Sequence, residues 1–300
     1  MRAAYLKFAE RLIKMSEITL ENLSYYHGKD TPYEIKALDN ISTSIKRGVI
    51  TGIIGHTGSG KSTLVQMFNG ILKPQDGRVL LDGEDIWARP KDIRKVRFRV
   101  GLVMQYPEYQ LFEETVYKDI AYGPKNMGIK DGELDAWVRE AAEFVGLAPE
   151  LLERSPFDLS GGQKRRAAIA GIIAMHPDVL VLDEPAAGLD PRGRDSIFDN
   201  IKRYQRQSGT TVVIVSHSME DMARLCDRLI VMSGGGIVME GECHEVFARS
   251  AQLSEVGLDI PQVTKLLMLL RERGVEVDCG AYTVEDALKE IKRLYEKNNI

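Results

Sequence analysis

A glycine-rich stretch that contains one lysine and one serine has the composition of a phosphate-binding loop. Its residues are Gly55, His56, Thr57, Gly58, Ser59, Gly60, Lys61 and Ser62, which fit the pattern glycine, any four residues, Gly-Lys-Ser/Thr. Apolar residues 49–54 precede it, and a helical pattern runs from Ser62 and Thr63 to Asn69, so the loop should join a buried strand to a helix. That geometry aims backbone N–H groups at one anion, with Lys61 on the outer phosphates and Ser62 on Mg²⁺. A glycine-rich turn that binds nothing is the alternative interpretation.

A second pair of glycines stands at another predicted helix start. Ser160 is a favourable N-cap, Gly161 and Gly162 leave backbone N–H groups free for an anion, and Gln163 follows. As helix capping alone this segment would be unremarkable. Together with a phosphate loop it predicts a second anion-binding element.

Two adjacent carboxylates follow four apolar residues, 179–182, that should form a central strand. Asp183 is placed to hold Mg²⁺ through its water shell, and Glu184 to polarise an attacking water. An ordinary strand that ends in an acidic turn is the alternative. Gln105 and His217 also stand at the ends of predicted strands, and open α/β sheets bind ligands at that edge.

The composition is that of an ordinary globular protein with one large domain and a small appendage. Hydrophobic residues make up 44% of the 300 residues and charged residues 28%, with a net charge of −4. No broad basic face is expected, so we expect no nucleic-acid partner. Three scattered cysteines suit a reducing cytoplasm, and no apolar run approaches the roughly 18 residues that span a bilayer.

An aromatic or imidazole ring could stack on a nucleotide base near the N-terminus. Tyr26 and His27 are the candidates, and a simple cluster in a surface loop is an equally good interpretation. Residues 1–15 form either a basic amphipathic helix or, as we favour, a leader translated upstream of a start at Met15. Residues 251–300 predict a small helical unit for dimerisation or regulation.

Taken together, these elements resemble the ATP-binding-cassette ATPases over residues 16–250. The resemblance rests on Gly55–Ser62, Gln105, Leu159–Gln163, Asp183-Glu184, Asp190 and His217 in this order. It implies an α/β fold: a P-loop (RecA-like) nucleotide-binding core, an antiparallel β subdomain and an inserted α-helical subdomain at about 106–176.

The same resemblance implies how the residues share the work. Two such subunits close head to tail around ATP, so Ser160 and Gly162 would serve the partner's nucleotide. Gln105 would sense the γ-phosphate and help to hold Mg²⁺, and His217 would stabilise the transferring phosphoryl group.

Several shorter segments are similar to those of the ATPases of energy-coupling factor transporters. These transporters have two ATPase paralogues, and Thr31-Pro32-Tyr33-Glu34 resembles the second of them. The features are residues 105–116, 123–128, 183–191 and 257–261. The resemblance implies a second ATPase subunit, a transmembrane coupling (T) component and a substrate-binding membrane (S) component for a vitamin or a transition metal. Two departures are His27 where a tyrosine is usual, and Cys243-His244 within a segment that is usually Gly-Thr-Pro.

Two rival classes fit less well. ATPases of this superfamily in DNA repair or translation have twin cassettes or long coiled coils, whereas this sequence has one cassette and no sustained heptads. A P-loop kinase would have no use for residues 159–163.

Overall fold

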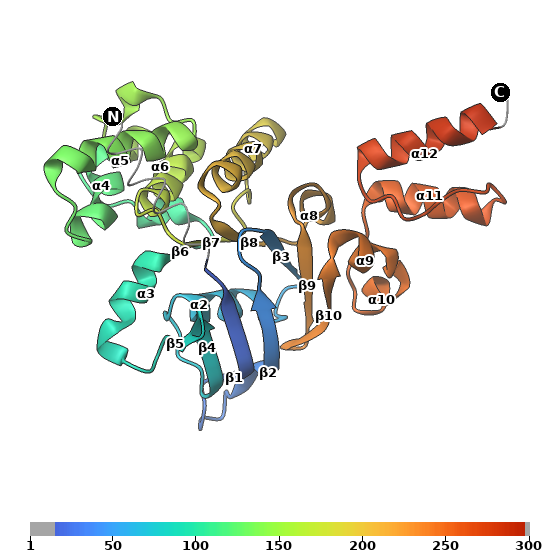
Figure 1. Cartoon of the computed structure of the whole chain (residues 1–300), viewed down its shortest axis with the longest axis horizontal. Helices are drawn as coiled ribbons and strands as arrows, with labels where there is room; N and C mark the ends of the chain where they lie inside the picture. Colours follow the sequence, from blue (N-terminus) through green and yellow to red (C-terminus); the bar gives the residue numbers. More distant parts are fainter. Residues whose placement is uncertain (1–15, 298–300) are drawn as a thin grey trace.

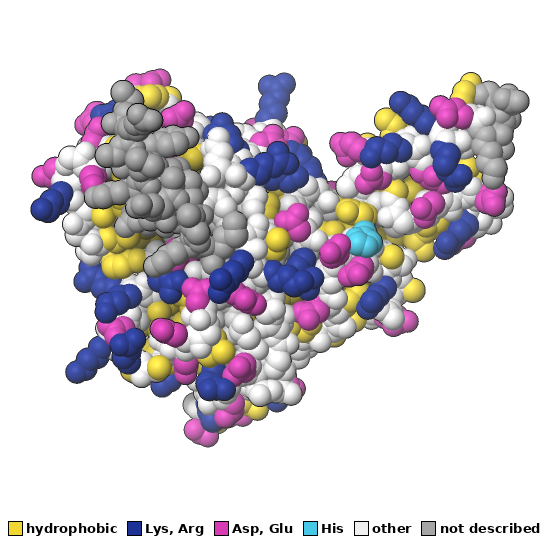
Figure 2. Space-filling model, in the orientation of Figure 1, with side chains coloured by type: hydrophobic (Ala, Val, Ile, Leu, Met, Phe, Trp, Pro, Cys, Tyr) yellow, Lys and Arg dark blue, Asp and Glu magenta, His cyan; other side chains and the backbone are white. Residues whose placement is uncertain are grey.

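The structure is a computed structural model that describes residues 16–297, and the prediction for residues 1–15 lies outside this range. Two sheets and the helices around them make up the described residues (Figure 1). Charged side chains of both signs are mixed over the face shown in Figure 2, where a notch separates the C-terminal helices from the remainder. None of the helices within residues 16–297 is long and apolar enough to cross a membrane.

The larger sheet has six strands in the order β10-β9-β3-β8-β7-β6. Its strands are β3 (Ile50–Ile54), β6 (Val100–Val103), β7 (Val179–Asp183), β8 (Thr211–Val215), β9 (Arg228–Ser233) and β10 (Gly236–Glu242). All adjacent strands are parallel except β10, which pairs antiparallel with β9 at the edge. Every residue of β3, β6, β7 and β8 is buried, as apolar strands covered on both faces should be. The predicted central strands are therefore confirmed.

The two faces of this sheet belong to different hydrophobic cores. Leu180 and Leu182 of β7 point into a core shared with the helices, whereas Val179 and Val181 face the smaller sheet. That alternation fixes the register, since a slip by one residue would exchange the two faces. The register in turn decides which side chains stand at the carboxyl ends of the strands.

The smaller sheet is antiparallel, with the order β2-β1-β4-β5. Its strands are β1 (Ile18–His27), β2 (Ile35–Ile45), β4 (Asp76–Leu81) and β5 (Glu84–Asp85). β1 extends through Tyr26 and His27, so both rings lie in a strand and the interpretation as a surface loop is wrong. Helix α2 (Lys61–Phe68) buries Leu64, Met67 and Phe68 in the core between the two sheets.

Helices α4 (Val116–Asn126), α5 (Asp131–Phe144) and α6 (Gly161–Ile173) lie in the chain between β6 and β7 and pack on one another (Figure 1). The sequence from 115 to 174 predicts helices with breaks at Pro124, Gly132, Pro149 and Pro156, and the break expected at Pro124 is wrong. Pro124 lies buried inside α4, where proline removes one hydrogen bond without ending the helix. A break does lie beside Gly132, between the end of α4 at Asn126 and the first turn of α5.

The remaining helices complete the chain. They are α3 (Ile93–Arg99), α7 (Pro191–Ser208), α8 (Met219–Leu225), α9 (Cys243–Ala248), α10 (Ser250–Glu255), α11 (Gln262–Glu272) and α12 (Val284–Lys297). Short 3-10 turns are η1 (Pro90–Asp92), η2 (Pro107–Gln110), η3 (Pro149–Leu151) and η4 (Pro156–Asp158). Helices α11 and α12 enclose a small core of their own around Leu267, Val277 and Ala287, at the far end of the molecule from α4 and α5 (Figure 1).

Candidate active site

The glycine-rich loop joins β3 to α2, as the sequence predicts. The Lys61 ammonium curls back over it and donates to the carbonyl oxygens of Gly55 at 2.7 Å and His56 at 2.9 Å. Burial lowers the pKa of Lys61, and the nearby charges of Glu184 and Asp183 act in the opposite direction. A half-buried cation is thus held over the loop by carbonyl oxygens, which a phosphate oxygen could replace.

The loop also needs glycine for its close approach to neighbouring backbone. A Cβ at Gly55 would lie 2.4 Å from the carbonyl oxygen of Met232. Gly60, at φ 97°, is in the left-handed region, and its Cβ would lie 2.5 Å from the carbonyl oxygen of Ala37. Side chains are excluded at these two positions, and His56, Thr57, Gly58 and Ser62 stay exposed at the surface of the loop. A loop of this form suits a bound phosphate.

Asp183 ends β7 beside this loop. Its side chain is buried, and burial together with the Glu184 charge raises its pKa, while the Ser62 hydroxyl and Lys61 act in the opposite direction. A hydroxyl and a carboxylate are oxygen donors of the kind Mg²⁺ prefers, so Ser62 and Asp183 fit that ion. The structure therefore brings together two of the three predicted metal ligands, which lie 121 residues apart in the sequence.

Glu184 follows in an unusual backbone conformation, with φ 50°. Its amide donates to the carbonyl oxygen of Val215 in β8 at 3.0 Å, which ties the turn to the neighbouring strand. The Nδ1 atom of His217, beyond the end of β8, lies 2.8 Å from Glu184 Oε1. Glu184 is mostly buried and His217 is mostly exposed, so the histidine covers the carboxylate from the solvent side. Strained residues of this kind gather at functional sites.

Other predicted residues lie at the ends or starts of elements. Gln105 is exposed just after β6. Asp190 caps α7, because its Oδ1 accepts a hydrogen bond of 2.6 Å from the amide of Gly193. Ser160 and Gln163 form a capping box at the start of α6, since each side chain bonds the other's amide. The capping box uses the acceptor oxygens of Ser160 and Gln163. Their O–H and N–H donors, and the first backbone N–H groups at Gly161 and Gly162, are available for a ligand.

The structure separates the two candidates for base stacking. The Nε2 atom of His27 lies 3.3 Å from Oγ1 of Thr63, in the first turn of α2. The Tyr26 ring lies on the opposite face of β1, under the ammonium groups of Lys36 at 5.5 Å and Lys29 at 6.0 Å. The side chain that stands beside the phosphate loop is therefore His27.

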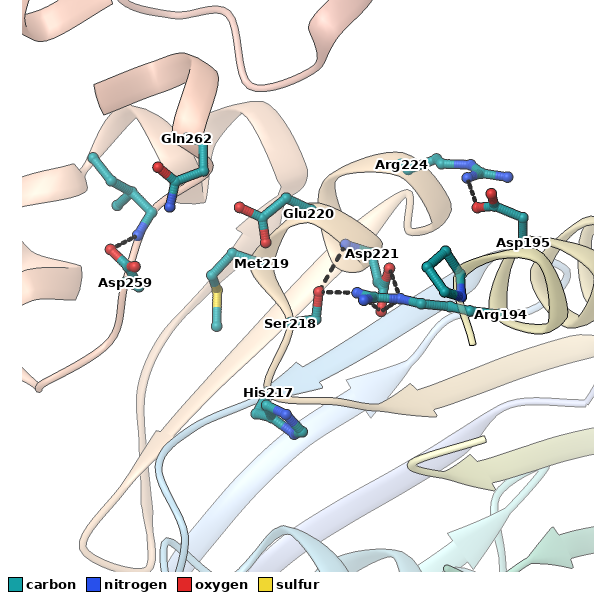
Figure 3. A pocket seen from close by; sticks show the side chains of 12 residues that line it. Arg194, Asp195, His217, Ser218, Met219, Glu220, Asp221, Arg224, Asp259 and Gln262 are labelled. Carbon is teal, nitrogen blue, oxygen red and sulfur yellow. Dashed lines mark hydrogen bonds and ion pairs between the residues drawn. The ribbon is translucent and has the colours of Figure 1, made fainter. Parts of the chain in front are cut away.

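A cavity of about 700 Å³ lies between α7, α8 and the start of α11 (Figure 3). His217 is the residue that this cavity shares with the predicted site. Arg194 lines the cavity, and its guanidinium donates to Asp221 at 2.8 Å and to Ser218 at 2.5 Å. Because the Arg194 charge is already paired, we do not assign a phosphate to this cavity.

Sequence reasoning missed one pair of residues. Arg165, in the second turn of α6, is almost fully buried and forms a two-pronged ion pair with Glu108 of η2. The signal was weak but present, because Lys164, Arg165 and Arg166 follow one another on a helix and cannot all face solvent.

Residues 38–187 match the family model described as "ABC transporter". The energy-coupling factor transporter ATP-binding protein EcfA2 of Clostridium tetani is 48% identical, over 93% of this chain and 97% of its own length. Its counterpart in Clostridium acetobutylicum is 50% identical, over 93% of this chain and 98% of its own length. The chain belongs to the ATP-binding proteins of energy-coupling factor transporters.

Solved structures of cassette ATPases agree with this energy-coupling factor assignment. CbiO1 from Clostridium perfringens, part of the ABC transporter complex CbiONQ, aligns with a TM-score of 0.70 and 40% identity over 80% of this chain and 93% of its own. A dimeric ATP-binding cassette in a post-hydrolysis state, bound to ADP and Pi, aligns with a TM-score of 0.68 and 27% identity over 75% of this chain and 98% of its own. The predicted fold class is therefore confirmed.

Proposed function

We propose that this chain is the ATP-hydrolysing subunit of an energy-coupling factor importer for a vitamin or a transition metal. The observation that carries the proposal is the shared edge of the large sheet. There the loop at Lys61, the Asp183-Glu184 pair and His217 meet. The names of the relatives favour transport over DNA repair or translation.

The residues divide the work of binding the substrate, ATP. Lys61 can exchange its hydrogen bonds with two carbonyl oxygens for bonds with the outer phosphates of ATP. The N–H groups and hydroxyls of the loop residues Gly55–Thr63 bind the same phosphates. Ser62 and Asp183 would hold Mg²⁺, with Gln105 as the ligand from the end of β6. When bound, the ion supplies charge that stabilises the transferring phosphoryl group. His27 offers a ring for the base.

Glu184 is the base of the proposed hydrolysis. Its carboxylate is mostly buried and His217 bonds one of its two oxygens, which leaves the other for a water molecule. Holding the carboxylate in one orientation lets it accept a proton from that water as the water attacks the γ-phosphate. His217 is exposed enough to contact the phosphoryl group from the solvent side.

The proposed partners follow from the relatives and from the glycine pair. One of the similar solved structures is a dimer, and another is part of the CbiONQ complex. We therefore propose a second ATPase subunit, whose nucleotide contacts Ser160, Gly161, Gly162 and Gln163 of this chain, with Asp190 near the contact. A membrane coupling component and a substrate-binding membrane component complete the importer. The chain would lie at the cytoplasmic membrane surface.

The proposed division of the chain follows the same plan. Residues 16–250 would form the nucleotide-binding domain, with a helical subdomain at about 106–176, and residues 251–300 a unit for dimerisation or regulation. The separate core around Leu267, Val277 and Ala287 supports a distinct C-terminal unit.

The test is to express the full chain with the membrane components encoded beside it and to purify what associates. In proteoliposomes the wild-type complex should hydrolyse ATP and take up its cargo. A complex with Lys61→Ala should assemble but bind ATP weakly and do neither. Hydrolysis that persists in Lys61→Ala, or a wild-type chain that associates with no membrane protein, would contradict the proposal.

A further inference from the structure

Arg165 is an arginine whose side chain is buried inside the protein, with 3% of it exposed. Its Nε and Nη2 atoms donate to the two oxygens of Glu108 at 3.1 Å and 2.8 Å. Its Nη1 atom donates to the carbonyl oxygen of Ala187. One guanidinium therefore joins three segments that are far apart in the chain: η2, α6 and the turn after β7.

Each of the two residues that Arg165 contacts lies close in the chain to a residue of the proposed site. Glu108 is three residues beyond Gln105, in the 3-10 turn that directly follows it. Ala187 is three residues beyond Glu184, and its amide donates to the Glu184 carbonyl oxygen at 3.1 Å. The path from Arg165 to the backbone of Glu184 thus consists of two hydrogen bonds, joined through Ala187.

We propose that Arg165 is a positioning residue for the hydrolytic reaction. It holds the segment that carries Glu184 at a fixed place relative to the segment that carries Gln105 and relative to helix α6. Arg165 itself contacts neither residue, and it acts through Ala187 and Glu108. The inference rests on the proposed function, because it names what keeps the base of that same site in place.

The chemistry explains why this position needs arginine. Its planar fork can bond both carboxylate oxygens and still present a third donor to a carbonyl, whereas lysine offers a single point charge. Removing one partner of a buried pair leaves the other charge without compensation, which strains the surrounding segments. A small displacement of a catalytic group can lower turnover by about 10²-fold without changing its identity.

The experiment compares Arg165→Met with Arg139→Met in the purified full transporter. Arg139 also bonds both oxygens of one carboxylate, Asp135, but on the exposed surface of α5, so it is a matched control. Arg165→Met should lower kcat for ATP by about 10²-fold and leave KM for ATP unchanged, the pattern of a lost contribution in the transition state. Arg165→Lys should lose less, and adding Glu108→Gln to Arg165→Met should cause little further loss. Arg139→Met should behave as wild type.

A second measurement does not depend on hydrolysis. Hydrogen exchange of the full chain should show faster exchange in Arg165→Met at two separate segments, 106–111 and 185–189. The reporters are the amides of Tyr109, Ala187 and Leu189, which bond the carbonyl oxygens of Tyr106, Glu184 and Ala186. In Arg139→Met both segments should exchange at the wild-type rate.

Three results would overturn the proposal. The first is turnover in Arg165→Met equal to that in Arg139→Met. The second is a raised KM with unchanged kcat, which would make Arg165 part of nucleotide binding. The third is faster exchange spread evenly over the chain, as expected from a general loss of stability. If the wild-type chain did not hydrolyse ATP, the proposed function would fail, and joint exposure of the two segments would still decide whether Arg165 links them.

Discussion

The Nδ1 atom of His217 lies 2.8 Å from Oε1 of Glu184, although the two residues follow different strands of the sheet. The contact exists because β7 and β8 are adjacent and parallel, with Asp183 paired to Val215. The residues that follow each strand therefore emerge at the same edge. A buried carboxylate with a histidine at its side is an arrangement suited to placing a water molecule.

His217→Leu should lower ATP turnover and leave ATP affinity close to that of the wild type. The reason is that His217 contacts Glu184, whereas the hydrogen bonds of Lys61 are with its own loop. General-base catalysis typically contributes about 10²–10⁴-fold, so we expect the loss of the group that orients the base to cost about 10²-fold, the lower end of that range. The measurement is kcat together with calorimetric ATP affinity. His244→Leu is the control, since His244 is an exposed histidine that pairs with Glu242. Equal activity in the two variants would contradict the role given to His217.

Much of this site could be predicted from the sequence, because its chemistry depends on residue types at fixed spacing. The loop around Lys61 and the pair Asp183-Glu184 both follow runs of buried apolar residues. Burial on both faces gives such runs a clear pattern, and the end of a run then marks the ligand-binding edge. Their meeting in space needs only that the strands be parallel and close together.

Gly162→Asp should leave ATP binding to the isolated chain intact and block its ATP-dependent association with a second ATPase subunit. A carboxylate at the start of α6 would face the γ-phosphate held by the other subunit, and like charges in a water-poor cleft repel strongly. Crosslinking or light scattering with the partner subunit measures the association. Normal association with ATP bound would exclude a role for this segment toward the partner's nucleotide. Loss of ATP binding by the isolated variant would place the segment in its own site.

His27→Ala should weaken ATP binding more than Tyr26→Ala does. The His27 ring lies beside Thr63 of α2, whereas the Tyr26 ring faces Lys36 on the other side of β1. Loss of one base-stacking ring is worth about 1–3 kcal/mol. Titration with a fluorescent ATP analogue gives both affinities under the same conditions. A larger loss in Tyr26→Ala would reverse the assignment.

Arg99→Met should destabilise the protein by about 1.5–3 kcal/mol, the range for hydrogen bonds to charged groups. Arg99 bonds Asp178 at 2.6 Å and Asp82 at 2.5 Å, and so ties the small sheet to the large one. Urea unfolding at pH 7 gives the change. The control is Arg78→Met, which removes a more exposed ion pair with Glu21 and should cost about 0–1 kcal/mol.

The ion pair between Arg99 and Asp82 also makes the stability of the fold depend on pH. Burial alone would raise the pKa of Asp82, but hydrogen bonds from Arg99, the Glu17 amide and Ser16 bring it below its ordinary 3.8. A carboxyl group whose pKa is lower in the folded protein stabilises the fold at any pH above its pKa in the unfolded chain. This stabilisation is lost as the pH falls through the pKa of the folded protein. Below about pH 4 the wild type should therefore lose more stability than Arg99→Met does. Parallel loss in both proteins would show that Arg99 does not set this pKa.

Other features could not be predicted, because they depend on packing between distant segments. The run of basic residues at 164–166 indicates that one of them is buried, but it shows neither that this residue is Arg165 nor that its partner is Glu108. Pro124 looked like a helix end, yet it lies buried within α4. The choice between Tyr26 and His27 likewise depended on which face of β1 meets α2, which the register of the sheet decides.

The most direct test of the central claim is ATP turnover by the purified transporter with Glu184→Gln in this chain. Glutamine keeps the size of the side chain and its contact with His217, but it cannot take a proton from water. The account predicts that ATP affinity stays at the wild-type value while hydrolysis at this chain's phosphate loop falls by about 10²–10⁴-fold. A partner subunit made inactive by the same type of substitution removes its own contribution from the measurement. Hydrolysis near the wild-type rate in that complex would contradict the claim that Glu184 is the base.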